Sequence, residues 1–115
     1  LNDIIITGPK KGEILIIGWG STNGPISEAQ NTLSKNGMKI AHIQLSCLWP
    51  LTENLKTIAS QFKHVVVVEM NVGQLVNLLK VDITPNAKSI TQVSGKPFRV
   101  KDLIEKFTII IKLGK

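Results

Sequence analysis

The loop Gly18–Gly24 is the first segment whose residue types could bind a ligand, because it joins an apolar run to a helical pattern. Backbone N–H groups at a helix N-terminus attract anions, and hydroxyl side chains add further donors. The candidate anion-binding residues are Gly20, Ser21, Thr22 and Gly24. The glycine spacing departs from the dinucleotide-binding fingerprint, and the Gly-Lys-Ser/Thr ending of a P-loop is absent from the sequence. The loop is a candidate site for a phosphate or carboxylate, and a tight turn without a ligand is the alternative that we rank first.

The second segment is Glu69–Gln74, which follows a run of four valines. A carboxylate at the end of an apolar strand is costly to bury unless it has a partner. Glu69 could act as a general acid or base, but no His, Lys or second acid lies nearby in the sequence. We therefore favour a structural reading, in which Glu69 accepts backbone N–H groups and the following residues begin a helix. The residues with this structural or interface role are Glu69, Asn71, Gly73 and Gln74.

The two histidines and the cysteine lack the spacing of a metal site or a nucleophile. His42 and His64 fall in or beside apolar runs without an E-x-x-H pattern, so we expect packed side chains. Cys47 has no neighbouring base and is expected to be a small buried residue. Because no Ser–His–acid or Cys–His set can be assembled, we predict no catalytic residue and no metal site. The residues alone indicate a non-catalytic domain with one candidate anion loop.

The length and composition are those of one ordinary globular domain. The 115 residues are 43% hydrophobic and 19% charged, which argues against disorder. The longest apolar runs are too short to cross a bilayer, and no signal-peptide pattern opens the chain. Cys47 is the single cysteine, which excludes an intramolecular disulfide and indicates the reducing cytoplasm.

The net charge of +6 raises the question of nucleic-acid binding. Arg99 is the only arginine among 14 basic residues, the lysines are scattered except for Lys10 and Lys11, and tyrosine is absent. Bidentate recognition of bases and phosphates prefers arginine, and aromatic side chains stack on bases. We therefore predict no nucleic-acid partner, and no membrane partner either.

Apolar runs alternate with amphipathic stretches along the chain. The predicted strands are Ile4–Ile6, Glu13–Gly18, Lys39–Leu45, His64–Val68 and Lys88–Val93. The predicted helices run from Pro25 to Gly37, along a stripe of Leu55, Ile58, Ala59 and Phe62, over Val72–Leu79 after an Asn71 cap, and over Val100–Phe107. The tail Thr108–Lys115 is ambiguous between a strand and a docked terminus.

This alternation is typical of βαβ units, in which helices cover both faces of a parallel sheet. We predict a single α/β domain over residues 1–115, a three-layer sandwich of about five mostly parallel strands. Ile4–Ile6 has no crossover helix after it and is the candidate antiparallel edge strand. In such sheets ligands bind at the carboxyl ends of strands, near a reversal of strand order. Both candidate segments follow such ends.

Three strings of the sequence, Gly18–Thr22, Val65–Leu75 and Gly95–Phe98, resemble the 2-oxoacid:ferredoxin oxidoreductases. The similarity is to the carboxyl-terminal domain of the alpha subunit, above all of the 2-oxoglutarate type, and covers most of the chain. The resemblance implies a fold like the carboxyl-terminal domain of transketolase. A chain that begins at Leu1 is then expected of a domain excised from a longer alpha subunit.

The resemblance implies an enzyme that decarboxylates a 2-oxoacid oxidatively with thiamine diphosphate and Mg²⁺, reduces ferredoxin through an iron–sulfur cluster and forms an acyl-coenzyme A. In the family the thiamine cofactor lies between other domains, so this domain is expected to bind no cofactor and to complete the interface with the beta subunit and the other domains. Contact of Gly20, Ser21 and Thr22 with coenzyme A is a hypothesis. The apolar tail Ile109–Ile111 is expected to be covered by a partner chain and to let the isolated domain self-associate.

Three alternatives stay open at this point. The first is the equivalent domain of a pyruvate-type or branched-chain relative, or of another thiamine-dependent enzyme. The second is a free-standing module that binds a phosphate ligand. The third is a basic nucleic-acid binder, which the lysine-rich composition leaves as the least favoured.

Overall fold

The computed structural model of the chain describes residues 6–19, 22–45, 53–69, 87–91 and 98–113. The predictions made for residues in the gaps, including Cys47 and the helix Val72–Leu79, lie outside the described residues.

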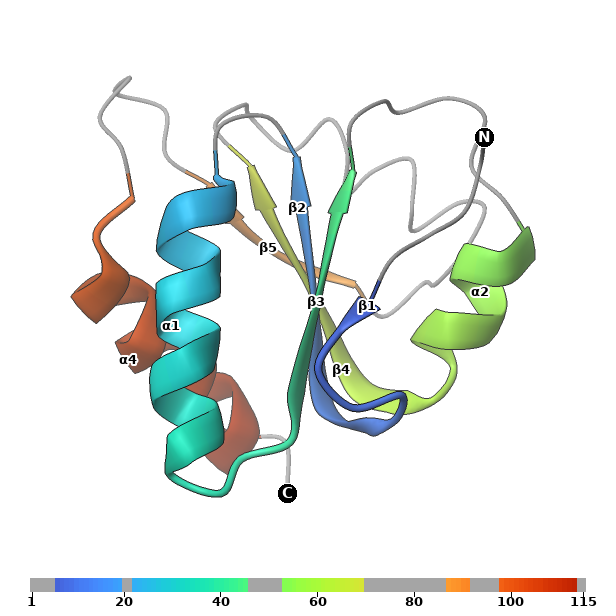
Figure 1. Cartoon of the computed structure of the whole chain (residues 1–115), viewed down its shortest axis with the longest axis horizontal. Coiled ribbons are helices and arrows are strands. Elements are labelled where there is room, and N and C mark those ends of the chain that lie inside the picture. The colour runs from blue at the N-terminus through green and yellow to red at the C-terminus, as the bar shows by residue number, and fades with distance from the viewer. Residues whose placement is uncertain (1–5, 20–21, 46–52, 70–86, 92–97, 114–115) are drawn as a thin grey trace.

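The described residues form a five-stranded sheet in the order β1-β3-β2-β4-β5 (Figure 1). Its strands are β1 (Ile6–Thr7), β2 (Gly12–Trp19), β3 (Ile40–Leu45), β4 (Phe62–Glu69) and β5 (Lys88–Thr91). The outer strand β1 pairs antiparallel with β3, whereas the other neighbours are parallel. The predicted mostly parallel sheet with one antiparallel edge strand is therefore confirmed.

Helices cover both faces of this sheet, as predicted (Figure 1). Helices α1 (Asn23–Lys35) and α4 (Val100–Leu113) pack on one face, and α2 (Glu53–Ala59) packs on the other. Successive side chains of a strand point to opposite faces, so Ile14 and Ile16 join the core under α1 and α4. Leu15 and Ile17 join the core under α2. No helix within the described ranges is long and apolar enough to cross a membrane.

The end of α1 shows how the sequence sets an element boundary. Gly37 has a φ of +88°, a conformation that glycine adopts without the strain of a side chain. The N–H of Gly37 donates to the carbonyl of Ser34 at 3.0 Å, and that of Met38 donates to the carbonyl of Leu33 at 3.1 Å. These two bonds form a Schellman motif, which turns the chain into β3. The predicted helix stop at Gly37 is confirmed.

Two element predictions need correction. Phe62 does not continue α2, because the helix ends at Ala59 and Phe62 opens β4. Phe62 packs in the same core as Leu55 and Ala59, so an apolar spacing of helical type runs across a helix-to-strand junction. The ambiguous tail from Thr108 to Leu113 is neither a strand nor a separate terminus, since it continues α4.

Candidate functional site at the carboxyl ends of the strands

The four parallel strands end at one edge of the sheet. The register pairs Gly18 of β2 with Val68 of β4, and Glu69 of β4 with Thr91 of β5. The order of the strands reverses at β2, because β3 lies on one side of it and β4 on the other. Open α/β sheets bind ligands in the crevice at such a reversal, so this edge is the candidate site.

Gly18 is the more crowded of the two glycines that the structure describes at this edge. A Cβ atom on Gly18 would overlap the Oε1 atom of Gln44, and would lie 2.6 Å from Ile26 Cδ1 and 3.0 Å from Thr22 Oγ1. The missing side chain lets β3 and the start of α1 close over the end of β2. Gly24 differs, since a Cβ there would have no atom within 4 Å.

The predicted anion loop is only partly described. Thr22 is the N-cap residue of α1, and its carbonyl accepts the N–H of Ile26 at 3.2 Å. The Thr22 side chain is buried beside Gly18, whereas Gly24 is exposed in the first turn of α1. Gly20 and Ser21 lie outside the described residues. An anion at this loop would meet the N–H groups of the first turn more readily than the Thr22 hydroxyl.

Glu69 ends β4, where the sequence predicts it, and its side chain is fully buried. The other predicted residues of its segment, Asn71, Gly73 and Gln74, lie outside the described residues. The structural or interface role of all four residues stays a prediction.

A part-buried polar pair on β3 is the feature that the sequence pattern did not indicate. His42 Nε2 lies 3.0 Å from Gln44 Oε1, and because an amide oxygen only accepts, the imidazole donates this hydrogen bond. Burial lowers the pKa of His42, and the hydrogen bond to Gln44 opposes part of that effect. His42 is therefore a neutral donor at pH 7. The expectation of packed histidines is confirmed, since His64 is buried as well.

Gln30 connects helix α1 to the strands β1 and β3. Its Nε2 atom donates to the carbonyl of Thr7 in β1 at 2.6 Å and to that of Ile40 in β3 at 3.0 Å. Gln30 sits between Ala29 and Leu33 on the buried side of α1. A polar residue inside an apolar stripe was the signal that could have pointed to it.

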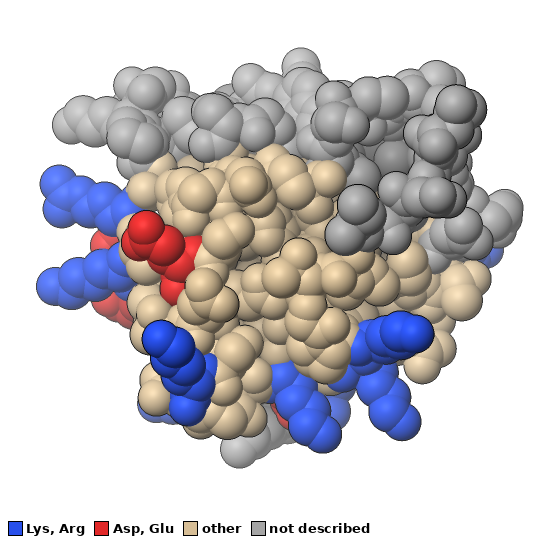
Figure 2. Space-filling model, in the orientation of Figure 1, with Lys and Arg blue, Asp and Glu red and all other residues tan. Residues whose placement is uncertain are grey.

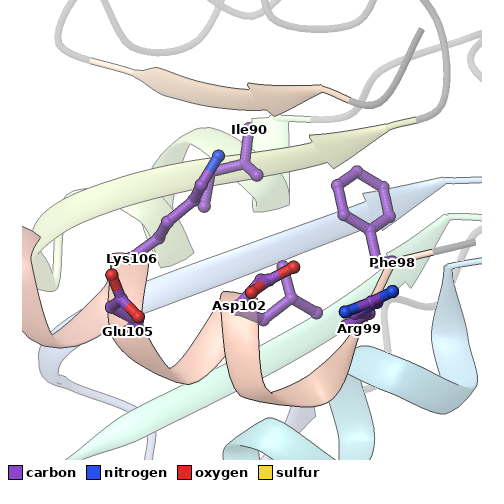
Figure 3. A pocket seen from close by; sticks show the side chains of 7 residues that line it. Ile90, Phe98, Arg99, Asp102, Glu105 and Lys106 are labelled. Carbon is purple, nitrogen blue, oxygen red and sulfur yellow. The ribbon is translucent and has the colours of Figure 1, made fainter. Parts of the chain in front are cut away.

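A separate small pocket lies between β5 and α4 (Figure 3). Its volume is about 110 Å³, and its lining residues are Ile90, Phe98, Arg99, Asp102, Leu103, Glu105 and Lys106. The Lys106 side chain points toward Ile90, and Phe98 stands at the other end (Figure 3). A water molecule occupies about 30 Å³ of liquid, so this space suits a few waters rather than a large cofactor.

The described residues do not supply the ligands of a divalent cation. No three His, Cys, Asp or Glu side chains come together within the described ranges as a metal site requires. Glu69 lies on the α2 side of the sheet, and His42 points to the α1 side. Within the described ranges these residues therefore form no Mg²⁺ site.

The family model for the pyruvate:ferredoxin oxidoreductase core domain II matches residues 12–103. The chain belongs to this family. The match runs from the start of β2 into α4 and so includes the candidate edge. The resemblance to 2-oxoacid:ferredoxin oxidoreductases drawn from the sequence strings is thereby confirmed.

Relatives of this core domain II chain agree with the assignment. This chain is 37% identical to the 2-oxoglutarate oxidoreductase subunit KorA of Mycobacterium tuberculosis, and the match covers 79% of this chain and 14% of that protein. The 2-oxoglutarate:ferredoxin oxidoreductase of Magnetococcus marinus, solved with 2-oxoglutarate, coenzyme A and succinyl-CoA bound, superposes with a TM-score of 0.89. That match is 25% identical and covers 96% of this chain and 20% of that one.

The transketolase-like fold is confirmed by a further structure. An inactive tetramer of a split-gene transketolase covers 96% of this chain and 42% of its own, with a TM-score of 0.71 and 17% identity. At that identity the likeness concerns the fold alone. The chain thus spans a small part of the length of KorA and of the Magnetococcus marinus enzyme.

Proposed function

We propose that this domain serves the alpha subunit of a thiamine diphosphate-dependent 2-oxoacid:ferredoxin oxidoreductase as a non-catalytic assembly domain. The parent enzyme would decarboxylate a 2-oxoacid, pass electrons through an iron–sulfur cluster to ferredoxin and form an acyl-coenzyme A in the cytoplasm. The observation that carries the proposal is the TM-score of 0.89 with a 2-oxoglutarate:ferredoxin oxidoreductase over 96% of this chain. The names of that enzyme and of KorA favour 2-oxoglutarate as the substrate.

The arrangement of ionisable groups supports a role without catalysis. Glu69, the acid at the candidate edge, is fully buried, and His42 donates its hydrogen bond to Gln44 inside the fold. A general base must reach the proton that it removes, and these two groups point to opposite faces of the sheet. The reacting groups are therefore expected in other domains of the subunit and in the beta subunit.

An assembly role has the two edges of the described sheet available to it. Among the described strands, β1 and β5 have two and four residues and each has one neighbour. Their outer backbone groups can pair with another chain or domain. We propose that the beta subunit and the remaining domains of the alpha subunit cover surfaces of this kind.

Calorimetric titration of the chain tests the non-catalytic role. We expect no saturable heat with thiamine diphosphate and Mg²⁺, because the described residues offer no cation site. Saturable binding of thiamine diphosphate would overturn this part of the proposal. Substrate choice is tested in the assembled enzyme, where coenzyme A-dependent reduction of ferredoxin should be faster with 2-oxoglutarate than with pyruvate. The opposite preference would contradict the 2-oxoglutarate assignment.

The loop Gly18–Gly24 is proposed to approach coenzyme A in the assembled enzyme. Its support is chemical, since the first turn of α1 has no acidic residue to oppose an anion. Ser21→Ala should raise the KM for coenzyme A, whereas Ser34→Ala, exposed near the other end of α1, should leave it unchanged. Equal KM values in the two variants would contradict the loop contact and leave the assembly role intact.

A further inference from the structure

A basic groove lies at the edge where the parallel strands begin, opposite the candidate site. Lys11 precedes β2, Lys39 precedes β3, and Lys63 is the second residue of β4. Because β2 lies between β3 and β4, the three lysines meet at one edge. They line a groove of about 450 Å³ together with Glu13, Gln61 and Phe62. In Figure 2 the lower rim of the molecule shows projecting basic side chains with little red between them.

Backbone contacts fix the walls of this groove. The N–H of Gly12 donates to the carbonyl of Gln61 at 3.3 Å, and that of Glu13 donates to the carbonyl of Lys39 at 2.9 Å. A Cβ on Gly12 would lie 2.6 Å from the carbonyl oxygen of Lys39. Glycine at this position therefore lets the β2 and β3 walls approach. Lys63 thus lies within a strand, and Lys11 and Lys39 each lie one residue before a strand.

The charge of the groove is strongly unbalanced. Lys63 Nζ lies 3.6 Å from Glu13 Oε1, and the Lys63 side chain is 67% exposed. Within the described part of the chain, Lys11 and Lys39 have no acidic partner within 4 Å, and both are exposed. Burial lowers the pKa of nearby His64, and the charges of Lys88 and Lys63 lower it further against the opposing effect of Glu13.

The residue types that line the groove favour one class of anionic partner over another. Phe62 is the aromatic residue of the groove, and it is 8% exposed, so it offers no open ring on which a base could stack. Arginine, the side chain that most often reads a nucleic-acid base through two hydrogen bonds, does not line the groove. Lysines act as hydrated point charges on flexible stems, and a cluster of them attracts a surface of opposite charge, such as a row of carboxylates.

We propose that this lysine groove docks a carboxylate-rich segment of a partner protein. The groove volume of about 450 Å³ suits a few side chains of an extended segment. Docking here leaves the carboxyl ends of the strands open, because the groove lies at the opposite edge of the sheet. The partner could thus bind while the candidate edge contacts other domains.

The test is fluorescence anisotropy of a labelled oligoglutamate peptide titrated with the full chain. The edge variant carries Lys11→Gln, Lys39→Gln and Lys63→Gln. The control variant carries Lys56→Gln, Lys101→Gln and Lys106→Gln, which are exposed elsewhere and remove the same net charge. We expect the edge variant to bind about tenfold more weakly, and the control variant to change by less than about twofold. Raising the salt concentration should weaken binding to the wild type more than to the edge variant.

A variant with Lys11→Arg, Lys39→Arg and Lys63→Arg keeps the charges and should retain binding, and circular dichroism checks that each variant folds. Equal losses in the edge and control variants would mean a general charge effect and overturn the proposal. So would an absence of salt-dependent peptide binding. Tighter binding of a labelled oligouridylate, lost in the edge variant, would replace the protein partner by a nucleic acid.

Discussion

The Nε2 atom of His42 lies 3.0 Å from the Oε1 atom of Gln44, on the same side of β3. That amide oxygen also occupies the space where a Cβ on Gly18 would be. One glutamine side chain thus accepts a hydrogen bond along β3 and fills the space over the end of β2. Three residues outside the predicted ligand set therefore pack together at the carboxyl ends of β2 and β3.

Replacing Gly18 by Ala is expected to destabilise the fold by about 1 kcal/mol, at the low end of the roughly 1–3 kcal/mol that overpacking costs, because the atoms in the way belong to side chains that can shift. The added methyl group would meet the side chains of Gln44 and Ile26, with Ile26 Cδ1 at 2.6 Å. Urea unfolding followed by circular dichroism measures the free energy of unfolding of the variant and the wild type.

The matched control for this prediction is Gly24→Ala. A Cβ at Gly24 meets no atom within 4 Å, and the residue lies in the first turn of α1. Alanine there should stabilise the chain by about 0.5 kcal/mol, since it lowers the entropy of the unfolded state without strain. If Gly18→Ala unfolded at the same urea concentration as Gly24→Ala, the crowding at Gly18 would be refuted.

Stability should fall as the pH is lowered from 7.5 toward 5.5, because the pKa of His42 is lowered by burial in the folded chain. In the unfolded chain a histidine has a pKa of about 6.5, so below that pH the unfolded state takes up a proton that the folded state resists. The contribution of neutral His42 is therefore complete above pH about 6.5 and is lost as the pH falls toward its folded pKa.

The free energy of unfolding at several pH values checks this dependence. His42→Gln should flatten the profile, since it removes the titrating group. His64→Gln should flatten it as well, because burial and then the charge of Lys88 lower the pKa of His64. A profile that kept its full slope in the double variant would show that neither histidine is its cause.

Gln30→Ala should lower the free energy of unfolding by about 2 kcal/mol, because it leaves two backbone carbonyls without their donor. These carbonyls belong to Thr7 and Ile40, on the antiparallel β1–β3 pair. Asn31→Ala, exposed on the next residue of α1, should change stability by less than about 0.5 kcal/mol. Hydrogen exchange should also become faster at the Thr7 amide in Gln30→Ala. Unchanged exchange there would argue against the bridging role.

The sequence predicted the sheet because its central strands are buried on both faces. Ile14–Ile17 and Val65–Val68 are continuous apolar runs, and each residue packs into one of two cores whatever its side. The antiparallel edge strand was predicted because no crossover helix separates Ile4–Ile6 from the next strand. Both patterns depend on residues that are close together in the sequence, so they can be recognised without a structure.

The remaining features depend on packing between distant segments. Gly18 and Gly24 look alike in the loop, and the approach of the Gln44, Ile26 and Thr22 side chains is what distinguishes the first from the second. Phe62 matched the helical spacing of α2 because both elements face the same core. The β-branched tail suggested a strand, but packing of α4 against the α1 side of the sheet overrides that propensity.

The apolar tail is expected to promote self-association of this domain, through a smaller surface than its sequence suggests. Ile110 and Ile111 pack partly against the core on the α1 side, whereas Ile109 is 46% exposed on α4. Ile109→Ser should therefore shift sedimentation at high concentration toward the monomer, since an exposed apolar side chain contributes to association when it is buried. Lys101→Ser, exposed on the same helix, should leave the distribution unchanged. A wild-type chain that stayed strictly monomeric at high concentration would refute association through α4.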